Sequence, residues 1–219
     1  MSAASPRASA ADFRRPPPAL PNFSHIRRSW DAALGVSVAT LLPGEYYVTR
    51  HNESIFTVLG SCVSACVRER VLGIGGMNHF MLPLDRSGGT SAWAEHDVSS
   101  ATRYGNVAME RLLNDILKLG GRRENLEFKV IGGGKVLDMK LDVGLRNAQF
   151  VRDYLRAEGF AISGEDLGDR FARKLYYSPK SGMVRVKRLI SNSHRAVFER
   201  EEAFSPTPAQ VESGSVELF

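Results

Sequence analysis

The order of periodic segments along the chain is the feature that most restricts its fold. Residues 104–119 and 146–157 have the apolar spacing of helices, and glycine follows each of them. Short runs rich in β-branched and aromatic residues, bounded by turn residues, surround these helices and indicate strands. The predicted strands are 46–49, 55–59, 71–77, 126–131, 160–162, 173–177 and 183–189, while 63–67 fits either a strand or a helical turn. This order predicts an α/β or α+β layered sandwich of mixed β-sheet with two main helices and one core.

Composition separates both ends of the chain from its middle. Residues 1–40 contain the run Pro16–Pro18 and several arginines, so we predict a disordered Pro/Arg-rich arm. The arm is either a plain tail or a docking or localising segment, and its Arg/Ser/Ala-rich start also fits an organelle transit peptide. A folded domain is expected over 41–198, followed by a flexible polar tail over 199–219. Residues 84–101 are polar and rich in Gly and Ser, which predicts an exposed loop.

Overall composition is that of a globular protein. Hydrophobic residues make up 43% and charged residues 24% of the 219 positions. No apolar run approaches the roughly 20 residues that a transmembrane helix needs. The net charge of +5 could attract nucleic acid or a membrane surface, but acidic and basic residues alternate along most of the chain. We therefore expect neither nucleic-acid binding nor membrane insertion.

The two cysteines, Cys62 and Cys66, do not form a disulfide framework, and their low number fits a reduced, cytoplasmic setting. Two cysteines in one segment could ligate a metal instead. Their C-x3-C spacing lacks the second ligand pair of a structural zinc site, so no metal is predicted. Cys66 lies in an apolar run and is expected to be a small core residue.

The segment 53–85 contains the parts of a nucleophilic cysteine site. Cys62 follows Gly60 and Ser61 at the end of a predicted strand, where a sharp turn could expose backbone N–H groups as an oxyanion hole. His79 could take the thiol proton and later return it to a leaving group. Thr57 could accept the second imidazole N–H and hold the ring. Alone, each residue has a structural alternative, because buried cysteine, histidine and threonine are ordinary.

A glycine run at Gly132–Gly134 precedes Lys135 and resembles a phosphate-binding loop. A P-loop requires Ser or Thr after its lysine, and Val136 stands there. We therefore predict a structural turn near the site.

Several motifs, in their order along the chain, resemble the CheD family of chemoreceptor glutamine deamidases over roughly residues 42–190. They are 59–63, the segment ending at 79–83, 104–106, 132–134, 144–147, 165–168 and the hairpin that contains Gly182.

The resemblance implies hydrolysis of glutamine side chains to glutamate on methyl-accepting chemotaxis receptors, in the cytoplasm. It assigns the nucleophile to Cys62, the acid–base group to His79 and the third site residue to Thr57, and it implies no cofactor. It also implies a fold similar to the deamidase domain of cytotoxic necrotising factor toxins, and a CheC-like phosphatase as a partner of some members. The alternatives are a non-catalytic adaptor that binds receptors or a phosphatase, and a general cysteine protease. The Cys62/His79 pair argues against the adaptor, which needs neither residue.

Overall fold

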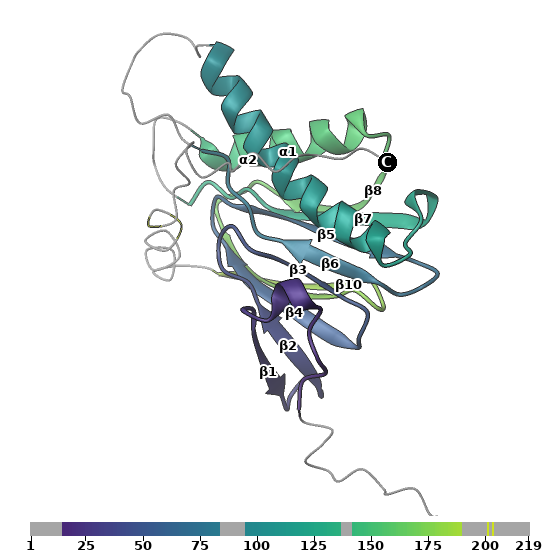
Figure 1. Ribbon diagram of the computed structural model, residues 1–219. Coiled ribbons are helices and arrows are strands. Elements are labelled where there is room, and N and C mark those ends of the chain that lie inside the picture. The colour runs from purple at the N-terminus through teal and green to yellow at the C-terminus, as the bar shows by residue number, and fades with distance from the viewer. Residues whose placement is uncertain (1–14, 84–94, 137–141, 190–200, 202, 204–219) are drawn as a thin grey trace, which may run out of the picture.

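A computed structural model describes residues 15–83, 95–136 and 142–189, together with the single positions Glu201 and Ala203. Two long helices lie over one β-sheet, and a second β-sheet lies beneath the first (Figure 1). The architecture is therefore the predicted α+β sandwich. None of the described helices has the length and apolar character required to cross a membrane.

The sheet farther from the helices has the strand order β1-β2-β4-β9-β10. Its neighbouring strands are antiparallel except for β2 and β4, which run parallel. The strands are β1 (Arg27–Asp31), β2 (Val36–Thr40), β4 (Glu53–Leu59), β9 (Ala172–Ser178) and β10 (Met183–Leu189). The central position of β4 buries both Ile55 and Leu59 completely.

The sheet beneath the helices has the order β3-β6-β5-β7-β8, with β7 and β8 parallel and the other neighbours antiparallel. Its strands are β3 (Tyr46–Thr49), β6 (Gly75–Asn78), β5 (Val63–Glu69), β7 (Leu126–Gly132) and β8 (Ile162–Leu167). Any side chain at Gly76 would collide with the carbonyl oxygen of Tyr47 on the paired strand. The glycine therefore allows β6 to pass closely beside β3.

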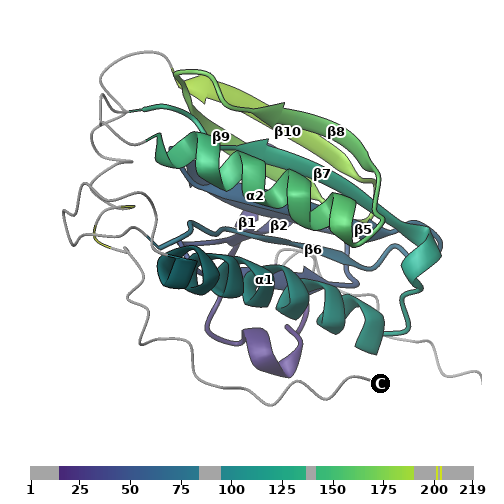
Figure 2. The same cartoon turned by 90° about the horizontal axis from the view of Figure 1, so that it is seen from above.

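Helices α1 (Glu95–Lys118) and α2 (Val143–Ala157) lie side by side on the outer face of this second sheet (Figure 2). α1 covers β3 and β6, whereas α2 covers β5, β7 and β8. The apolar spacing that predicted α1 is its buried face, because Met109, Leu112 and Ile116 are fully enclosed. Asp142 caps α2 by accepting a hydrogen bond from the backbone N–H of Leu145 at 2.9 Å.

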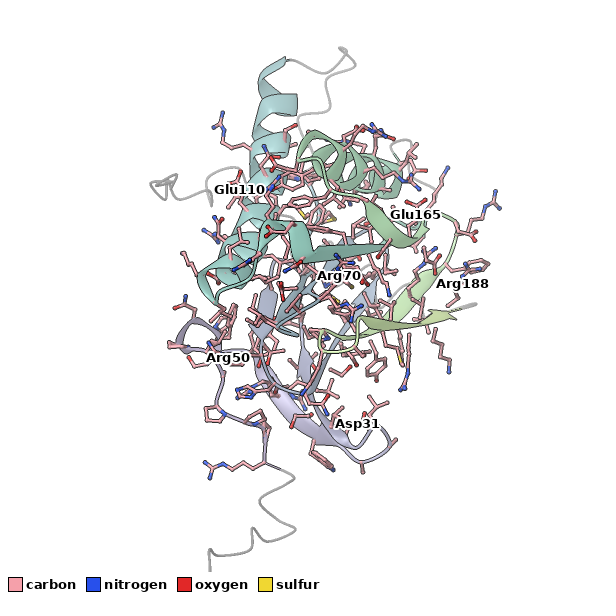
Figure 3. The ribbon with its side chains drawn as sticks, turned by 90° about the vertical axis from the view of Figure 1, so that its right-hand side faces the viewer. Asp31, Arg50, Arg70, Glu110, Glu165 and Arg188 are labelled. Atoms are coloured by element: carbon pink, nitrogen blue, oxygen red, sulfur yellow. The ribbon has the colours of Figure 1, made fainter. Side chains whose placement is uncertain are left out.

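Two short 3-10 turns, η2 (Pro21–Phe23) and η3 (Arg123–Asn125), complete the described elements. Charged side chains of both signs emerge from the helices and strands, as Asp31, Glu110, Glu165 and Arg188 show in Figure 3. Some are paired at the surface, for example Glu165 with Arg152 at 2.8 Å. The positive and negative groups are intermixed on these elements, as the alternation in the sequence predicts.

The prediction of a disordered arm over 1–40 is wrong for its second half. Strands β1 and β2 form one side of a sheet, and Phe23 packs edge-on against Tyr46 and Tyr47 with ring centroids 5.1 and 5.3 Å away. Arg28 forms an ion pair with the buried Glu53 at 3.0 Å. Composition misses these strands because their stability comes from pairing with β4, a distant segment. Residues 1–14 lie outside the described residues.

Other boundaries differ in smaller ways. Residues 95–101, predicted as part of a loop, are the first turns of α1, and 84–94 lie outside the described residues. The ambiguous run 63–67 is in β5, in the middle of a sheet. The strand predicted over 160–162 begins only at Ile162 and continues to Leu167.

Candidate functional site

The loop from Gly60 to Cys62, called the 60–62 loop below, carries the chain from β4 in one sheet to β5 in the other. A turn after β7 supports it: Gly133 donates its N–H to the Cys62 carbonyl at 2.7 Å, and Gly134 to the Gly60 carbonyl at 2.9 Å. Gly132 has φ 119°, and a side chain there would collide with the Cys62 carbonyl oxygen. The glycine run is therefore the predicted structural turn, and it fixes the backbone of the loop.

His79 follows β6 and is held beside Cys62 by the backbone. Val63 and Phe80 exchange N–H···O hydrogen bonds of 3.0 Å in both directions. In this antiparallel register Cys62 is the diagonal neighbour of His79, and one donor atom of each lies within 4.8 Å of the other. The N–H of His79 also donates to the Glu45 carbonyl at 2.9 Å. The antiparallel bridge between Val63 and Phe80 thus brings Cys62 and His79 together, although they are distant in the sequence.

Thr57 on β4 completes the predicted set and determines the tautomer of His79. Its Oγ1 donates to the Leu41 carbonyl at 2.9 Å and lies 2.7 Å from Nδ1 of His79. Because a hydroxyl has one proton, Oγ1 must accept a hydrogen bond from Nδ1–H. The other ring nitrogen, Nε2, is then free to act as a base, and this buried atom has no hydrogen-bond partner among the described residues.

Burial sets the protonation of the thiol and the imidazole. Cys62 is fully enclosed and His79 is 2% exposed. Removal from water lowers the pKa of His79 to about 4, although the nearby Glu201 carboxylate opposes this change. Burial also raises the pKa of the Cys62 thiol well above its usual value, and Glu201 adds to the rise. Both groups are therefore neutral near pH 7 in this arrangement.

Glu201 is the site residue that the sequence did not indicate. Its Oε1 accepts hydrogen bonds from the N–H of Gly60 at 2.7 Å and of Cys62 at 3.3 Å. Its Oε2 accepts from Ser61 twice, from the N–H at 2.9 Å and from Oγ at 2.7 Å. The 60–62 loop thus presents the N–H groups of Gly60 and Cys62 to one oxygen atom, as an oxyanion hole requires.

The expectation of a flexible tail over 199–219 is wrong for Glu201, which is only 2% exposed. No local signal could have revealed it, because it is one glutamate among several near the end of the chain and lies about 140 residues from its partners. Only the fold brings the two segments together. Ala203 is exposed, and the remainder of this segment lies outside the described residues.

Cys62, His79 and Glu201 are also a group that could supply metal ligands. One donor atom from each lies within 4.8 Å of the others, and thiolate, imidazole and carboxylate are ligands that zinc accepts. Both carboxylate oxygens, however, already accept hydrogen bonds from the 60–62 loop, and Nδ1 is engaged by Thr57. The arrangement is better suited to holding an acyl oxygen beside a thiol and a base.

Two buried asparagines support the site, and the sequence had assigned no role to either. Asn147 on α2 donates to the Ser61 carbonyl at 2.8 Å and accepts from the Leu82 N–H at 3.0 Å. Asn78 accepts from the Ala65 N–H at 2.8 Å. They tie the 60–62 loop and β5 to the chain around His79. An asparagine on the buried face of a predicted helix is the signal that could have identified Asn147.

Cys66 lies on β5 and is fully buried, as expected for a core residue. Burial raises the pKa of its thiol. A pocket of about 270 Å³ reaches His79 from the side of β3 and α1, where Tyr46, Tyr104 and Arg111 are among its lining residues. Tyr104 has its phenol pKa raised, first by burial and second by the proximity of Cys62.

The family model described as CheD chemotactic sensory transduction matches residues 81–188. Among curated proteins, the chain is 52% identical to the probable chemoreceptor glutamine deamidase CheD of Halorhodospira halophila, over 93% of this chain and 94% of that protein. Proteins of the same name from Hahella chejuensis and Hydrogenovibrio crunogenus are each 46% identical, over 96% and 89% of this chain and 99% and 100% of their own lengths. With this identity along nearly its whole length, the chain belongs to the CheD family.

Proposed function

We propose that the protein is a chemoreceptor glutamine deamidase, which converts glutamine side chains of methyl-accepting receptors to glutamate and releases ammonia. The relatives' names support the activity and the substrate class. One geometric observation carries the proposal: a carboxylate, the group that deamidation produces, is bound by the backbone N–H groups of the 60–62 loop beside a thiol and an imidazole.

In the proposed reaction, the substrate carboxamide takes the place of the Glu201 carboxylate. Its carbonyl oxygen then accepts hydrogen bonds from the N–H groups of Gly60 and Cys62, at the position of Oε1. The Nε2 atom of His79 removes the thiol proton as Sγ attacks the carbonyl carbon. The negative charge that develops on the oxygen is stabilised by the same N–H groups.

His79 then donates the proton to the departing nitrogen, the C–N bond breaks, and ammonia leaves a thioester on Cys62. Water attacks the thioester with Nε2 as the base, which forms the glutamate carboxylate and restores the thiol. Thr57 accepts from Nδ1–H throughout, so it holds the ring while its charge changes. Every step uses these side chains, backbone N–H groups and water.

The resting protonation states require an explanation in this mechanism. With a high thiol pKa and a low imidazole pKa, the thiolate–imidazolium pair is disfavoured while Glu201 is bound. Part of the rise in the thiol pKa comes from the Glu201 carboxylate, and replacing that anion by a neutral carboxamide removes this part. Substrate binding therefore removes one of the effects that oppose the thiolate, and it also removes the Glu201 charge that favours protonation of His79.

The finer setting is also a proposal: the protein acts on methyl-accepting receptors in the cytoplasm, and a CheC-like phosphatase is a candidate partner. One alternative is a non-catalytic adaptor that binds receptors or that phosphatase. It is favoured by the full burial of Cys62 and by the raised pKa of its thiol, which keep this group neutral and enclosed beside Glu201.

Ammonia release from a receptor fragment separates the two functions. The enzyme should release ammonia stoichiometrically with Gln-to-Glu conversion, and Cys62→Ala should abolish both. An adaptor would bind the fragment equally well with cysteine or alanine at position 62, and it would release no ammonia.

A further inference from the structure

The side chain of Glu201 occupies a position that a reacting acyl group would need. Four donors converge on its two oxygens, three backbone N–H groups and one hydroxyl, all from the 60–62 loop. One carboxylate oxygen lies within 4.8 Å of both Sγ of Cys62 and a ring nitrogen of His79. A substrate side chain could not enter while this carboxylate remains.

From these contacts we infer that Glu201 is a built-in product mimic, which occupies the acyl site and holds the enzyme in an inactive, closed form. The inference rests on the proposed function for the identity of the product, a glutamate side chain. It adds a regulatory group: the Glu201 side chain must leave the acyl site before a receptor glutamine can bind.

The partners of Glu201 argue against a merely structural role. A buried carboxylate usually pairs with Arg or Lys, because an isolated charge is costly to remove from water. In the described part of the chain, the hydrogen bonds to Glu201 come instead from backbone N–H groups and the Ser61 hydroxyl. Such a concentration of N–H donors is an anion site, and the proposed reaction requires one at this place.

The same geometry indicates which acyl group binds more tightly. At the Oε2 position, Ser61 offers a hydroxyl, which can donate or accept, and an N–H, which can only donate. A carboxylate oxygen satisfies both, whereas the NH₂ of a carboxamide can pair only with the hydroxyl. The site therefore favours the carboxylate over the carboxamide, as expected of a product mimic.

Attachment to the same chain makes this mimic effective. A group on the same chain binds intramolecularly, so its effective concentration does not depend on the protein concentration. A receptor glutamine must therefore compete with a carboxylate that is always present. The negative charge of Glu201 also opposes formation of the Cys62 thiolate, so occupancy blocks both binding and activation.

The first test measures the accessibility of Cys62 without any receptor. Wild type, Glu201→Ala and Glu202→Ala are treated with iodoacetamide in the presence of a chelator, and the labelled cysteine is identified by peptide mass spectrometry. Glu202→Ala is the matched control because it changes the charge equally at the adjacent position. We expect Glu201→Ala to label at Cys62 several times faster than wild type and Glu202→Ala, because the carboxylate no longer fills the space beside Sγ. Equal labelling rates in all three proteins, with unchanged circular dichroism, would overturn the inference.

The second test uses a receptor fragment. Deamidation should be faster with Glu201→Ala than with wild type or Glu202→Ala. Faster labelling of Cys62 without deamidation by any variant would refute the proposed deamidase and leave the closed form supported. Deamidation that is equal in all three proteins would refute the closed form and leave the deamidase supported.

The third test turns position 201 into a substrate. Glu201→Gln places a carboxamide beside Cys62, and attack by Sγ, loss of ammonia and hydrolysis by water should regenerate glutamate at this position. Mass spectrometry of the peptide would show the mass gain that accompanies exchange of NH₂ for OH. The double variant Cys62→Ala/Glu201→Gln should retain the introduced carboxamide. Persistence of that carboxamide in the presence of Cys62, in a preparation active on the receptor fragment, would show that the side chain at position 201 does not adopt the substrate position.

Discussion

The hydroxyl of Thr57 lies 2.7 Å from Nδ1 of His79 while it donates its proton to the Leu41 carbonyl. This relationship makes Nδ1 a donor and leaves Nε2 unprotonated. A threonine thereby performs a positioning role that usually belongs to a carboxylate or an amide. Because it carries no charge, it orients the ring without raising the imidazole pKa, which burial is free to lower.

Substitution of Thr57 should therefore reduce the rate less than loss of Cys62 or His79. Thr57→Ser keeps the hydroxyl and should retain most activity. Thr57→Val removes the acceptor but preserves the shape, and it leaves the buried Nδ1–H unsatisfied at a cost of about 1–3 kcal/mol. The Gln-to-Glu mass shift on a receptor fragment measures each rate. A Thr57→Val variant as inactive as Cys62→Ala would show that the hydroxyl does more than orient the ring.

Substitution of Cys62 should abolish deamidation, whether to alanine or to serine, since the hydroxyl is the poorer nucleophile. His79→Ala should lower the rate by about 10²–10⁴-fold, the usual contribution of general acid–base catalysis. Cys66→Ala is the matched control, because this thiol is equally buried but belongs to the core. Full activity of the His79 variant would assign the base to another residue.

Stability should depend on pH through His79. Its pKa falls from 6.5 in an exposed histidine to about 4 in the folded protein, so between these values the unfolded chain binds the extra proton. The contribution is complete above about pH 6.5 and is lost as the pH falls toward 4. Thermal melting at pH 7 and pH 5 measures it. Wild type should lose more stability than His79→Gln over this interval, and identical losses would contradict the burial of a neutral imidazole.

Arg28 should stabilise the domain although it lies in the segment that the sequence predicted to be disordered. It pairs with Glu53, whose side chain is fully buried and also accepts hydrogen bonds from Tyr47 and Thr49. Arg28→Ala would leave this carboxylate without its cation, at a cost of about 3 kcal/mol. Arg27→Ala, on the exposed position beside it, is the control. Urea denaturation should separate the two, and equal midpoints would mean that the pair adds nothing.

Local sequence determined much of this protein. The helical spacing of Met109, Leu112 and Ile116 identified α1, because an apolar stripe at that period can be buried only as a helix. The Gly-Ser-Cys turn and the histidine beyond it predicted a cysteine nucleophile with a histidine base. Thiol, imidazole and hydroxyl are recognisable as residue types, and the glycines marked places where the backbone must bend or approach another strand.

Tertiary structure decided what depends on contacts between distant segments. Strands β1 and β2 exist because β2 pairs with β4, and a proline-rich composition conceals that partnership. The His79 tautomer follows from the Leu41 carbonyl that takes the Thr57 proton. Glu201 reaches the 60–62 loop from far along the chain, and no pattern around it distinguishes it from other glutamates. The periodicity of apolar residues in a segment depends only on which of its side chains face the core and which face solvent. A hydrogen bond between remote segments depends on the fold that brings them together.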